Sequence, residues 1–484
     1  MNGYDYPPSQ PILAYGPLHE GSHFFAEGEI KFATGTFKCE FEVAYTHECR
    51  IIVVCYLPQP SLVKALYHEP SANGIEILRK RQYVDCQSIV GQDARNGYSI
   101  EIHTPIVLQE GYLDVPTILE GKSYQVQVTH EGRASVSGGS SYYKYELIGA
   151  SYLGRKNETY NLSPNVQADL RNTADSHSRN LGNQPVAELI LPDLEISPGW
   201  TARDSASVFC ALLSLAAGSD IRWTSESFYQ EQEKLSLTYW EGRRNVHSGR
   251  ITLPLMEDIR FSRTSGEIGR FIAKSFSHIT SGKITLVAAQ DYTRAIQHFM
   301  EYRLITRRAE DQVRLIGTSV EELLTAWESH MKHTPLSPIT EDVAKQLLSV
   351  ALNELDRIHR ESIEGDSEEE QEQNYQRTKG RISTFFSEEI LRPGFHKRLT
   401  SFFLHYSEKK PLSGSMKSRI DTFVKSRDSI VHTGKFSSNQ KNDWEPPYYN
   451  VIMIFALMMF RILGYDGEYV DYYQRRKDLS EQHP

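Results

Sequence analysis

The spacing of apolar residues changes along the chain, and this change limits the fold more strongly than any other feature of the sequence. Residues 28–57 read GEIKFATGTFKCEFEVAYTHECRIIVVCYL, in which apolar and polar residues alternate and β-branched and aromatic types are frequent. Such alternation is typical of antiparallel strands. From about residue 288, apolar residues return every three or four positions, which is typical of amphipathic helices. The sequence therefore predicts an α+β fold.

Three regions follow from this pattern. Residues 1–195 are predicted to form a β-rich domain, either a sandwich or a barrel. Residues 196–287 are predicted to be a mixed α/β region, in which SASVFCALLSLAAG is typical of a buried helix that ends at Gly218. In the same region DIRWTSESFY and LSLTYWEG are typical of strands. Residues 288–475 are predicted to form one bundle of helices.

Two stretches interrupt the regular pattern. Between Asn157 and Pro198 the periodicity fades, apart from AELILPDLEI, which predicts a long connection or an extended edge segment. The acidic stretch ESIEGDSEEEQEQ, residues 361–373, is predicted to be a solvated loop that interrupts the helical bundle.

Positive charge is concentrated in one segment of an acidic chain. The whole chain has a formal net charge of −9, which argues against a protein that coats nucleic acid by bulk attraction. Residues 375–436 nevertheless contain thirteen Lys or Arg against five Asp or Glu, a net charge of +8. Two interpretations remain open here: a local surface that binds a polyanion, or a solvated basic face of the helices.

The basic segment contains the stretch KSRDSIVHTGKF, residues 425–436, which joins residue types that suit chemistry on a phosphate group. Arg427 offers a planar, permanently charged group that matches phosphate oxygens. Histidine exchanges a proton near neutral pH, so His432 is the candidate general base or acid. Asp428 either orients one of these two residues or caps a turn of helix. If the bound polyanion is RNA, its 2′-hydroxyl is the nucleophile, so these groups need no obligatory metal.

A second pair of residues has a similar but looser spacing. Arg398 and His405 are separated by six residues, and Arg398 is followed by the apolar Leu399 rather than by a polar residue. We therefore favour Arg427 and His432 as the catalytic pair. The structural alternative for Arg427 and His432 is an ion pair together with a histidine on a helix surface.

The motif spacing does not suit a single regular helix. Five positions along a regular helix turn the side chain through about 500°, which leaves Arg427 and His432 about 140° apart. Two arrangements bring them to one phosphate. Either the helix breaks or begins inside the motif, or the site is shared between two copies of the chain.

The pattern of Arg427, a polar residue, His432 and the following Thr433-Gly434 resembles the motif of HEPN ribonuclease domains, in particular their ApeA-like anti-phage branch. The stretches ALLSLAAGSDIRW and EYRLITRRAEDQVRLIGTSVEELL are similar to segments that precede the HEPN bundle in those proteins. The resemblance covers about residues 200–470. It implies a metal-independent endoribonuclease without a cofactor, which produces 2′,3′-cyclic phosphate and 5′-hydroxyl ends.

The same resemblance implies partners and a role. HEPN domains pair so that two motifs line one cleft, which implies a homodimer with a two-fold interface. The implied role is abortive defence against phage by cutting RNA, with tRNA as one candidate target, on an unknown phage trigger. Residues 1–195 are then the sensor or regulatory domain. The competing class is a non-catalytic HEPN module that binds RNA or protein, or an antitoxin-like regulatory subunit. The candidate RNA-binding residues are Lys417, Arg419, Lys425 and Lys435.

Cysteine usage and hydropathy limit which cellular compartment and which metal chemistry we expect. The five cysteines are Cys39, Cys49, Cys55, Cys86 and Cys210, an odd number with no CxxC pair, which disfavours a disulfide framework. Zinc bound by Cys39, His47, Cys49 and Cys86 is a minor alternative to small buried thiols, so we predict no metal site. The N-terminus lacks a secretory signal pattern, and the longest apolar run, VIMIFALMMF, is half the length needed to span a bilayer. We therefore expect a cytoplasmic protein that does not enter membranes.

Overall fold

A computed structural model provides the structure of the chain. The residues that it describes are 10–14, 16–18, 22–32, 35–46, 50–56, 84–93, 98–103, 106–107, 117–121, 123–128, 141–149, 157–172, 187–240, 255, 265–305, 308–331, 341–361, 368–384, 394–407, 412–435 and 445–474. None of the helices in these ranges is long and apolar enough to cross a membrane.

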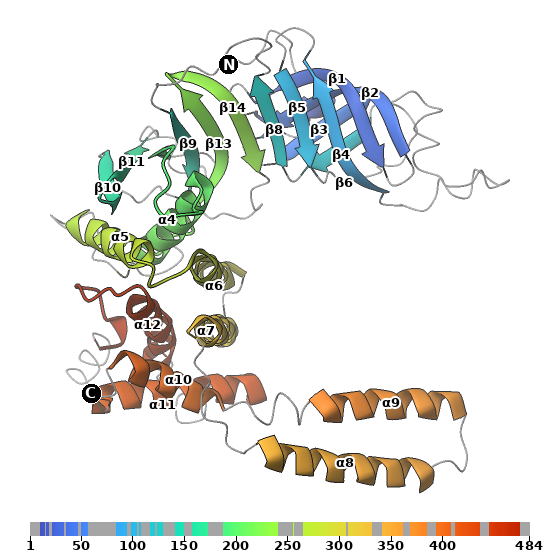
Figure 1. The fold of residues 1–484 in the computed structure, drawn as a ribbon, viewed down its shortest axis with the longest axis vertical. Helices are drawn as coiled ribbons and strands as arrows, with labels where there is room; N and C mark the ends of the chain where they lie inside the picture. Colours follow the sequence, from blue (N-terminus) through green and yellow to red (C-terminus); the bar gives the residue numbers. More distant parts are fainter. Residues whose placement is uncertain are drawn as a thin grey trace. The chain divides into compact units, whose positions relative to one another are not determined.

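The chain divides into two compact units. The first comprises Met1–Ile305 and Leu463–Val470, and the second comprises Thr306–Ile462 and Asp471–Pro484. The strands lie in the first unit and most helices in the second, which confirms the α+β class (Figure 1). Residues 196–287, predicted as a separate mixed region, belong to the first unit, and so does the helix α6 (Leu286–Ile305).

All pairings in the sheet of the first unit are antiparallel, and the described residues contribute fourteen strands to it. The strands are β1 (Phe24–Phe32), β2 (Gly35–Tyr45), β3 (Ile51–Tyr56), β4 (Val84–Gln92), β5 (Tyr98–His103), β6 (Ile106–Val107), β7 (Thr117–Gly121), β8 (Ser123–Val128), β9 (Ser141–Ile148), β10 (Glu158–Ser163), β11 (Val166–Asn172), β12 (Ala187–Pro192), β13 (Arg222–Gln230) and β14 (Glu233–Trp240).

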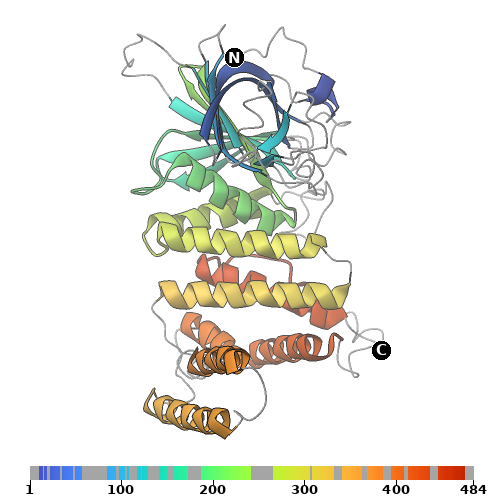
Figure 2. The same ribbon diagram turned by 90° about the vertical axis from the view of Figure 1, so that its right-hand side faces the viewer.

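Part of this sheet closes on itself. Strand β1 pairs with both β2 and β4, so β1, β2, β3, β7, β6 and β4 form a closed ring of hydrogen-bonded strands (Figure 2). The close approach of β1 to β4 depends on Gly28, because a Cβ there would lie 2.0 Å from the carbonyl oxygen of Val90. Side chains that alternate along these strands fill the ring, among them the buried Phe24, Phe41 and Val53.

The rest of the sheet is open and runs in the order β5-β8-β14-β13-β9-β12-β11-β10. The predicted strands DIRWTSESFY and LSLTYWEG are confirmed as β13 and β14, but they pair with β9 and β8 rather than forming a separate region. A boundary at residue 195 would therefore cut the sheet between β9 and β13. For residues 157–198, the alternative of a long connection was wrong in part, because these residues contain the β10–β11 hairpin at the end of the sheet order, which fits the alternative of an extended edge segment. The stretch AELILPDLEI, which keeps its periodicity, contains β12.

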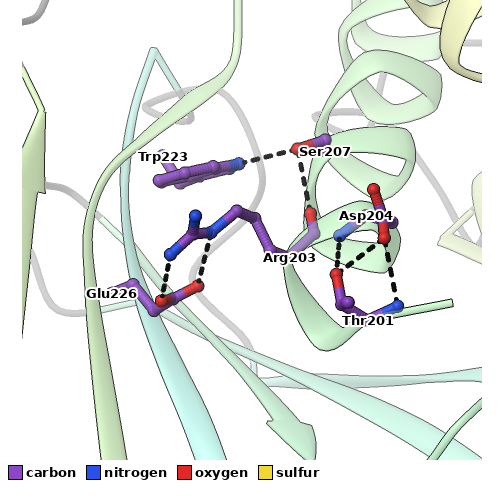
Figure 3. Close-up of polar contacts among 6 residues, drawn as sticks. All are labelled: Thr201, Arg203, Asp204, Ser207, Trp223 and Glu226. Carbon is purple, nitrogen blue, oxygen red and sulfur yellow. Dashed lines mark hydrogen bonds and ion pairs between the residues drawn. The ribbon is translucent and has the colours of Figure 1, made fainter. Parts of the chain in front are cut away.

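Helix α4 (Ala202–Ala217) packs against the open part of the sheet. A capping box begins it: Thr201 Oγ1 accepts from the Asp204 backbone N–H, and Asp204 Oδ2 accepts from the Thr201 N–H. The predicted end at Gly218 is confirmed, because this residue adopts the left-handed conformation with φ 67°. Figure 3 shows how the helix is tied to β13: the Arg203 guanidinium donates to both carboxylate oxygens of Glu226 at 2.8 and 3.3 Å.

After β14 the chain forms α5 (Ser265–Thr280) and then α6. The spacing of apolar residues did not predict α5. The segment Leu463–Val470 packs on α5 within the first unit. The Tyr465 ring meets Phe271 edge to face at 5.1 Å, and its hydroxyl donates to Glu267 at 3.2 Å. Gly464 lies directly under the His278 ring, where a Cβ would come within 2.3 Å of it.

The described helices of the second unit confirm the predicted helical region. They are α7 (Ala309–His330), α8 (Glu341–Glu361), α9 (Glu368–Thr384), α10 (Phe395–Tyr406), α11 (Gly414–Thr433) and α12 (Glu445–Ile462). The predicted acidic loop at residues 361–373 was wrong in part, because residues 368–373 begin α9. Glutamate and glutamine are good helix formers, and acidic residues are favourable in a first turn.

Helices α7, α10, α11 and α12 share one core. Trp327 of α7 is fully buried and meets Phe402 of α10 edge to face at 4.9 Å. Helix α12 contacts both α7 and α11, and its apolar run from Val451 to Phe460 is buried throughout. The VIMIFALMMF stretch is therefore part of the core.

Candidate functional site

The motif of Arg427 and His432 lies on a single continuous helix, α11. Ser413 caps its beginning, where the hydroxyl accepts from the Met416 N–H at 3.3 Å. Gly434 caps its end with φ 70°, the left-handed conformation that glycine adopts without strain. The Thr433-Gly434 pair thus has a local structural role. Of the two arrangements left open, the one in which the helix breaks or begins inside the motif is wrong.

Side-chain hydrogen bonds fix the last turn of α11. Thr433 Oγ1 donates to the Ser429 carbonyl at 2.7 Å, and the Ser429 hydroxyl donates to the Lys435 carbonyl at 3.0 Å. The backbone around His432 is therefore held on both sides.

Arg427 is half-buried and oriented by two carboxylates. Its Nη2 donates to Glu321 Oε2 of α7 at 2.8 Å, and its Nη1 donates to Asp428 Oδ1 at 3.1 Å. The guanidinium carbon lies 4.6 Å from the centre of the Phe395 ring, a cation–π contact. Its side chain is 19% exposed. A guanidinium has five N–H donors, so three remain for another acceptor beside the contacts within the described residues.

His432 is exposed and points about 140° away from Arg427 around the helix axis. Lys425, seven residues earlier, lies on the same face within about 20°, and Asp428 lies within about 40°. Both of these side chains reach solvent. One copy of α11 therefore directs Arg427 and His432 to different sides.

Asp428 orients Arg427, which is one of the two predicted roles. The alternative, that it caps a turn of helix, was wrong, because Asp428 lies inside α11, fifteen residues after the cap at Ser413.

Three of the four candidate RNA-binding residues, Lys417, Lys425 and Lys435, are exposed. Arg419 is different, because it is buried, pairs with Asp471 and lies over the Tyr473 ring at 4.8 Å. Its backbone carbonyl accepts from Asn450 at 2.7 Å. Its pattern of contacts is that of a structural residue, so the sequence prediction that it contacts RNA does not fit its position. Sequence spacing gave no sign of this burial.

The second candidate pair has a structural environment. The Arg398 side chain is 3% exposed and donates to both oxygens of Glu328, from Nε at 2.8 Å and from Nη2 at 2.7 Å. Its Nη2 also donates to Thr325 at 3.0 Å. The His405 ring packs edge to face on Trp327 at 5.4 Å. Arg398 therefore belongs to a buried ion pair, and His405 is an exposed histidine that packs on Trp327.

Glu321 and Glu328 lie seven residues apart on α7 and so on one face of it. Each anchors one of the two candidate arginines. The sequence analysis did not predict this role for Glu321. The signal that could have pointed to it is Gly317, a glycine one helical turn earlier in the interior of a predicted helix.

The described residues offer no metal cluster: within them no three His, Cys, Asp or Glu side chains gather closely enough to hold an ion. His47 and Cys49 of the alternative zinc site lie outside the described residues. Cys39 is buried and is not part of a disulfide. A hydrogen bond with Cys55 lowers the pKa of its thiol.

Comparisons with known proteins identify no relative. No family model matches the chain, and no curated protein and no solved structure matches it either.

Proposed function

We propose that this chain is an endoribonuclease of the HEPN type, in which Arg427 binds the scissile phosphate and His432 transfers protons. The observation that carries the proposal is the state of Arg427. It is oriented by Glu321 and Asp428, partly open to solvent, and retains three N–H donors beside these contacts. A planar guanidinium fixed in this way suits bidentate contact with phosphate oxygens.

The site is formed by two copies of the chain. Because α11 is continuous, Arg427 and His432 of one copy diverge by about 140° and do not reach one phosphate together. A two-fold pairing of the second units brings the Arg427 of one copy towards the His432 of the other. Such an interface is isologous, so each dimer has two equivalent sets of these groups around the cleft.

The reaction needs no cofactor. The 2′-hydroxyl oxygen attacks the adjacent phosphorus, and His432 accepts the hydroxyl proton. The bond from phosphorus to the 5′-oxygen breaks, and that oxygen takes up a proton from a protonated His432. Arg427 stabilises the charge that develops on the phosphoryl oxygens. The products are a 2′,3′-cyclic phosphate and a 5′-hydroxyl.

Lys417, Lys425 and Lys435 contribute positive charge to the RNA surface, and RNA affinity then falls as salt rises. Asp428 holds the Arg427 side chain in place for the phosphate.

The biological role that we propose is abortive anti-phage defence in the cytoplasm by an ApeA-like protein, with tRNA as a candidate target. The first unit is the sensor that restrains the nuclease. Expression of residues 306–484, which keep the first-unit segment Leu463–Val470, tests the restraint once circular dichroism shows that the fragment is folded. If the folded fragment is no more toxic to a bacterial host than the full chain, the first unit does not restrain the nuclease.

The function is tested with the purified full chain, total bacterial RNA and EDTA. Arg427→Ala and His432→Ala should each abolish fragments that end in 2′,3′-cyclic phosphate, with circular dichroism unchanged. Arg377→Ala in α9 and His396→Ala in α10 remove an exposed arginine and an exposed histidine elsewhere in the second unit and serve as controls. RNA binding without cleavage by the unmodified chain supports the non-catalytic module instead, and cleavage that stops in EDTA refutes metal independence.

A further inference from the structure

A glycine in the interior of α7 lies against the proposed phosphate-binding arginine. Gly317 is buried, and glycine is among the least favourable residues in the interior of a helix. A Cβ at this position would lie 3.2 Å from Cγ of Arg427 and 3.7 Å from its Cδ and Nε. The first distance is tighter than an ordinary contact between carbon atoms. The missing side chain therefore lets the aliphatic part of Arg427 lie directly on α7.

Glu321 follows Gly317 by four residues, so both lie on the same face of α7. Its Oε2 accepts from Arg427 Nη2 at 2.8 Å, which fixes one edge of the guanidinium. A charge-assisted hydrogen bond of this kind has a defined direction as well as strength.

Phe395, the first residue of α10, supports the flat face of the same group. Its ring centre lies 4.6 Å from the guanidinium carbon. The ring is itself held by Phe423 of α11, at 5.6 Å between centroids and in an edge-to-face arrangement. Phe423 is fully buried and precedes Arg427 by one helical turn.

We propose that Gly317, Glu321 and Phe395 form a cradle that positions Arg427 for catalysis, with each residue coming from a helix other than α11. The proposal rests on the function proposed above and assigns to that site three positioning residues outside the motif. The stem, one edge and one face of Arg427 are each held by a different member of the cradle. Held in this way, the guanidinium needs little reorganisation when a phosphate binds to its remaining N–H groups.

Arg398, the arginine of the second candidate pair, differs from Arg427 in how much of its side chain reaches solvent. The Arg398 guanidinium donates hydrogen bonds to Glu328 and Thr325 and is almost fully buried, so no side of it is open to a ligand. Arg427 is anchored by the same face of α7 but keeps part of its side chain in solvent.

Gly317→Ala is the most specific test of the cradle. The added methyl group forces Arg427 to shift by a few tenths of an ångström, while alanine favours the helix more than glycine does. We expect kcat for cleavage of bulk tRNA to fall about tenfold, with KM changed less than about threefold. Gly380→Ala in α9 is the matched control, because a Cβ there meets nothing within 4 Å. This control should cleave at the rate of the unmodified chain.

Glu321→Ala and Glu321→Gln form the second test. Alanine removes the anchor, so cleavage should fall about tenfold or more, whereas the glutamine oxygen still accepts from Nη2 and should retain most of the rate. A purely structural role for Glu321 would show instead as a lower urea midpoint in both variants, with no selective effect on kcat.

All variants are assayed as full chains beside Arg427→Ala. If Arg427→Ala is inactive while Gly317→Ala and Glu321→Ala cleave at the unmodified rate, the cradle is refuted and the ribonuclease function stands. Faster cleavage by Glu321→Ala also refutes positioning, because the carboxylate then competes with the phosphate. If Arg427→Ala still cleaves, or the unmodified chain cleaves no RNA, the function itself fails and the cradle with it.

Discussion

Arg398→Ala should destabilise the second unit far more than Arg427→Ala, although both remove an arginine anchored to the same face of α7. The Arg398 and Glu328 side chains are 3% and 14% exposed, and removing Arg398 leaves a largely enclosed carboxylate without its counterion. Loss of one partner of a buried ion pair costs about 3–5 kcal/mol. The Arg427 and Glu321 side chains are 19% and 39% exposed, and solvent screening limits the stability contribution of such a pair to about 1 kcal/mol.

Hydrogen exchange with mass spectrometry measures this difference where it arises. At 1.4 kcal/mol for each factor of ten, a loss of 3 kcal/mol speeds amide exchange in peptides from α7 and α10 by about a hundredfold. Arg427→Ala should speed it by less than about tenfold while it abolishes cleavage. The double variant Arg398→Ala/Glu328→Ala leaves no unpaired buried charge, so it should exchange more slowly than Arg398→Ala alone. Exchange in Arg398→Ala within threefold of the unmodified chain would refute this account of the pair.

Two further predictions concern the ends of helices and pH. Gly434→Ala should cost about 1 kcal/mol in the urea unfolding of the second unit, because alanine is strained at φ 70°, whereas Gly394→Ala, at φ −56°, should be nearly neutral. Equal losses in the two variants would contradict this. Burial and then the charges of Lys283 and Lys274 lower the pKa of His278, so the unfolded chain binds more protons and stability should fall as pH drops from 7 towards 5. His278→Gln should flatten that dependence in urea midpoints, and an unchanged slope would show that His278 is not responsible.

Local features of the fold were readable from the sequence because helices are built from contacts three and four residues apart. The stretch FHKRLTSFFLHY coincides with α10, and Gly218 ends α4 as its position predicts. Helix geometry alone also predicts that Arg427 and His432 lie about 140° apart around α11, because both residues belong to the same regular helix. The loop predicted for the acidic stretch was wrong in part because Glu and Gln occur both in solvated loops and in helices such as the first turns of α9.

Contacts between distant residues required the tertiary structure. Alternating residues indicate strands but not their partners, so the closure of the ring between β1 and β4, and the pairing of β13 with β9, could not be predicted. The burial of Arg419 against Asp471 depends on a segment 52 residues further along the chain. Glu321 is 106 residues from Arg427 and has no motif of its own. The sequence by itself determined which side chains are candidates for the proposed chemistry. Packing among α7, α10 and α11 decided which arginine is enclosed and which remains open, because burial is a property of neighbours in space.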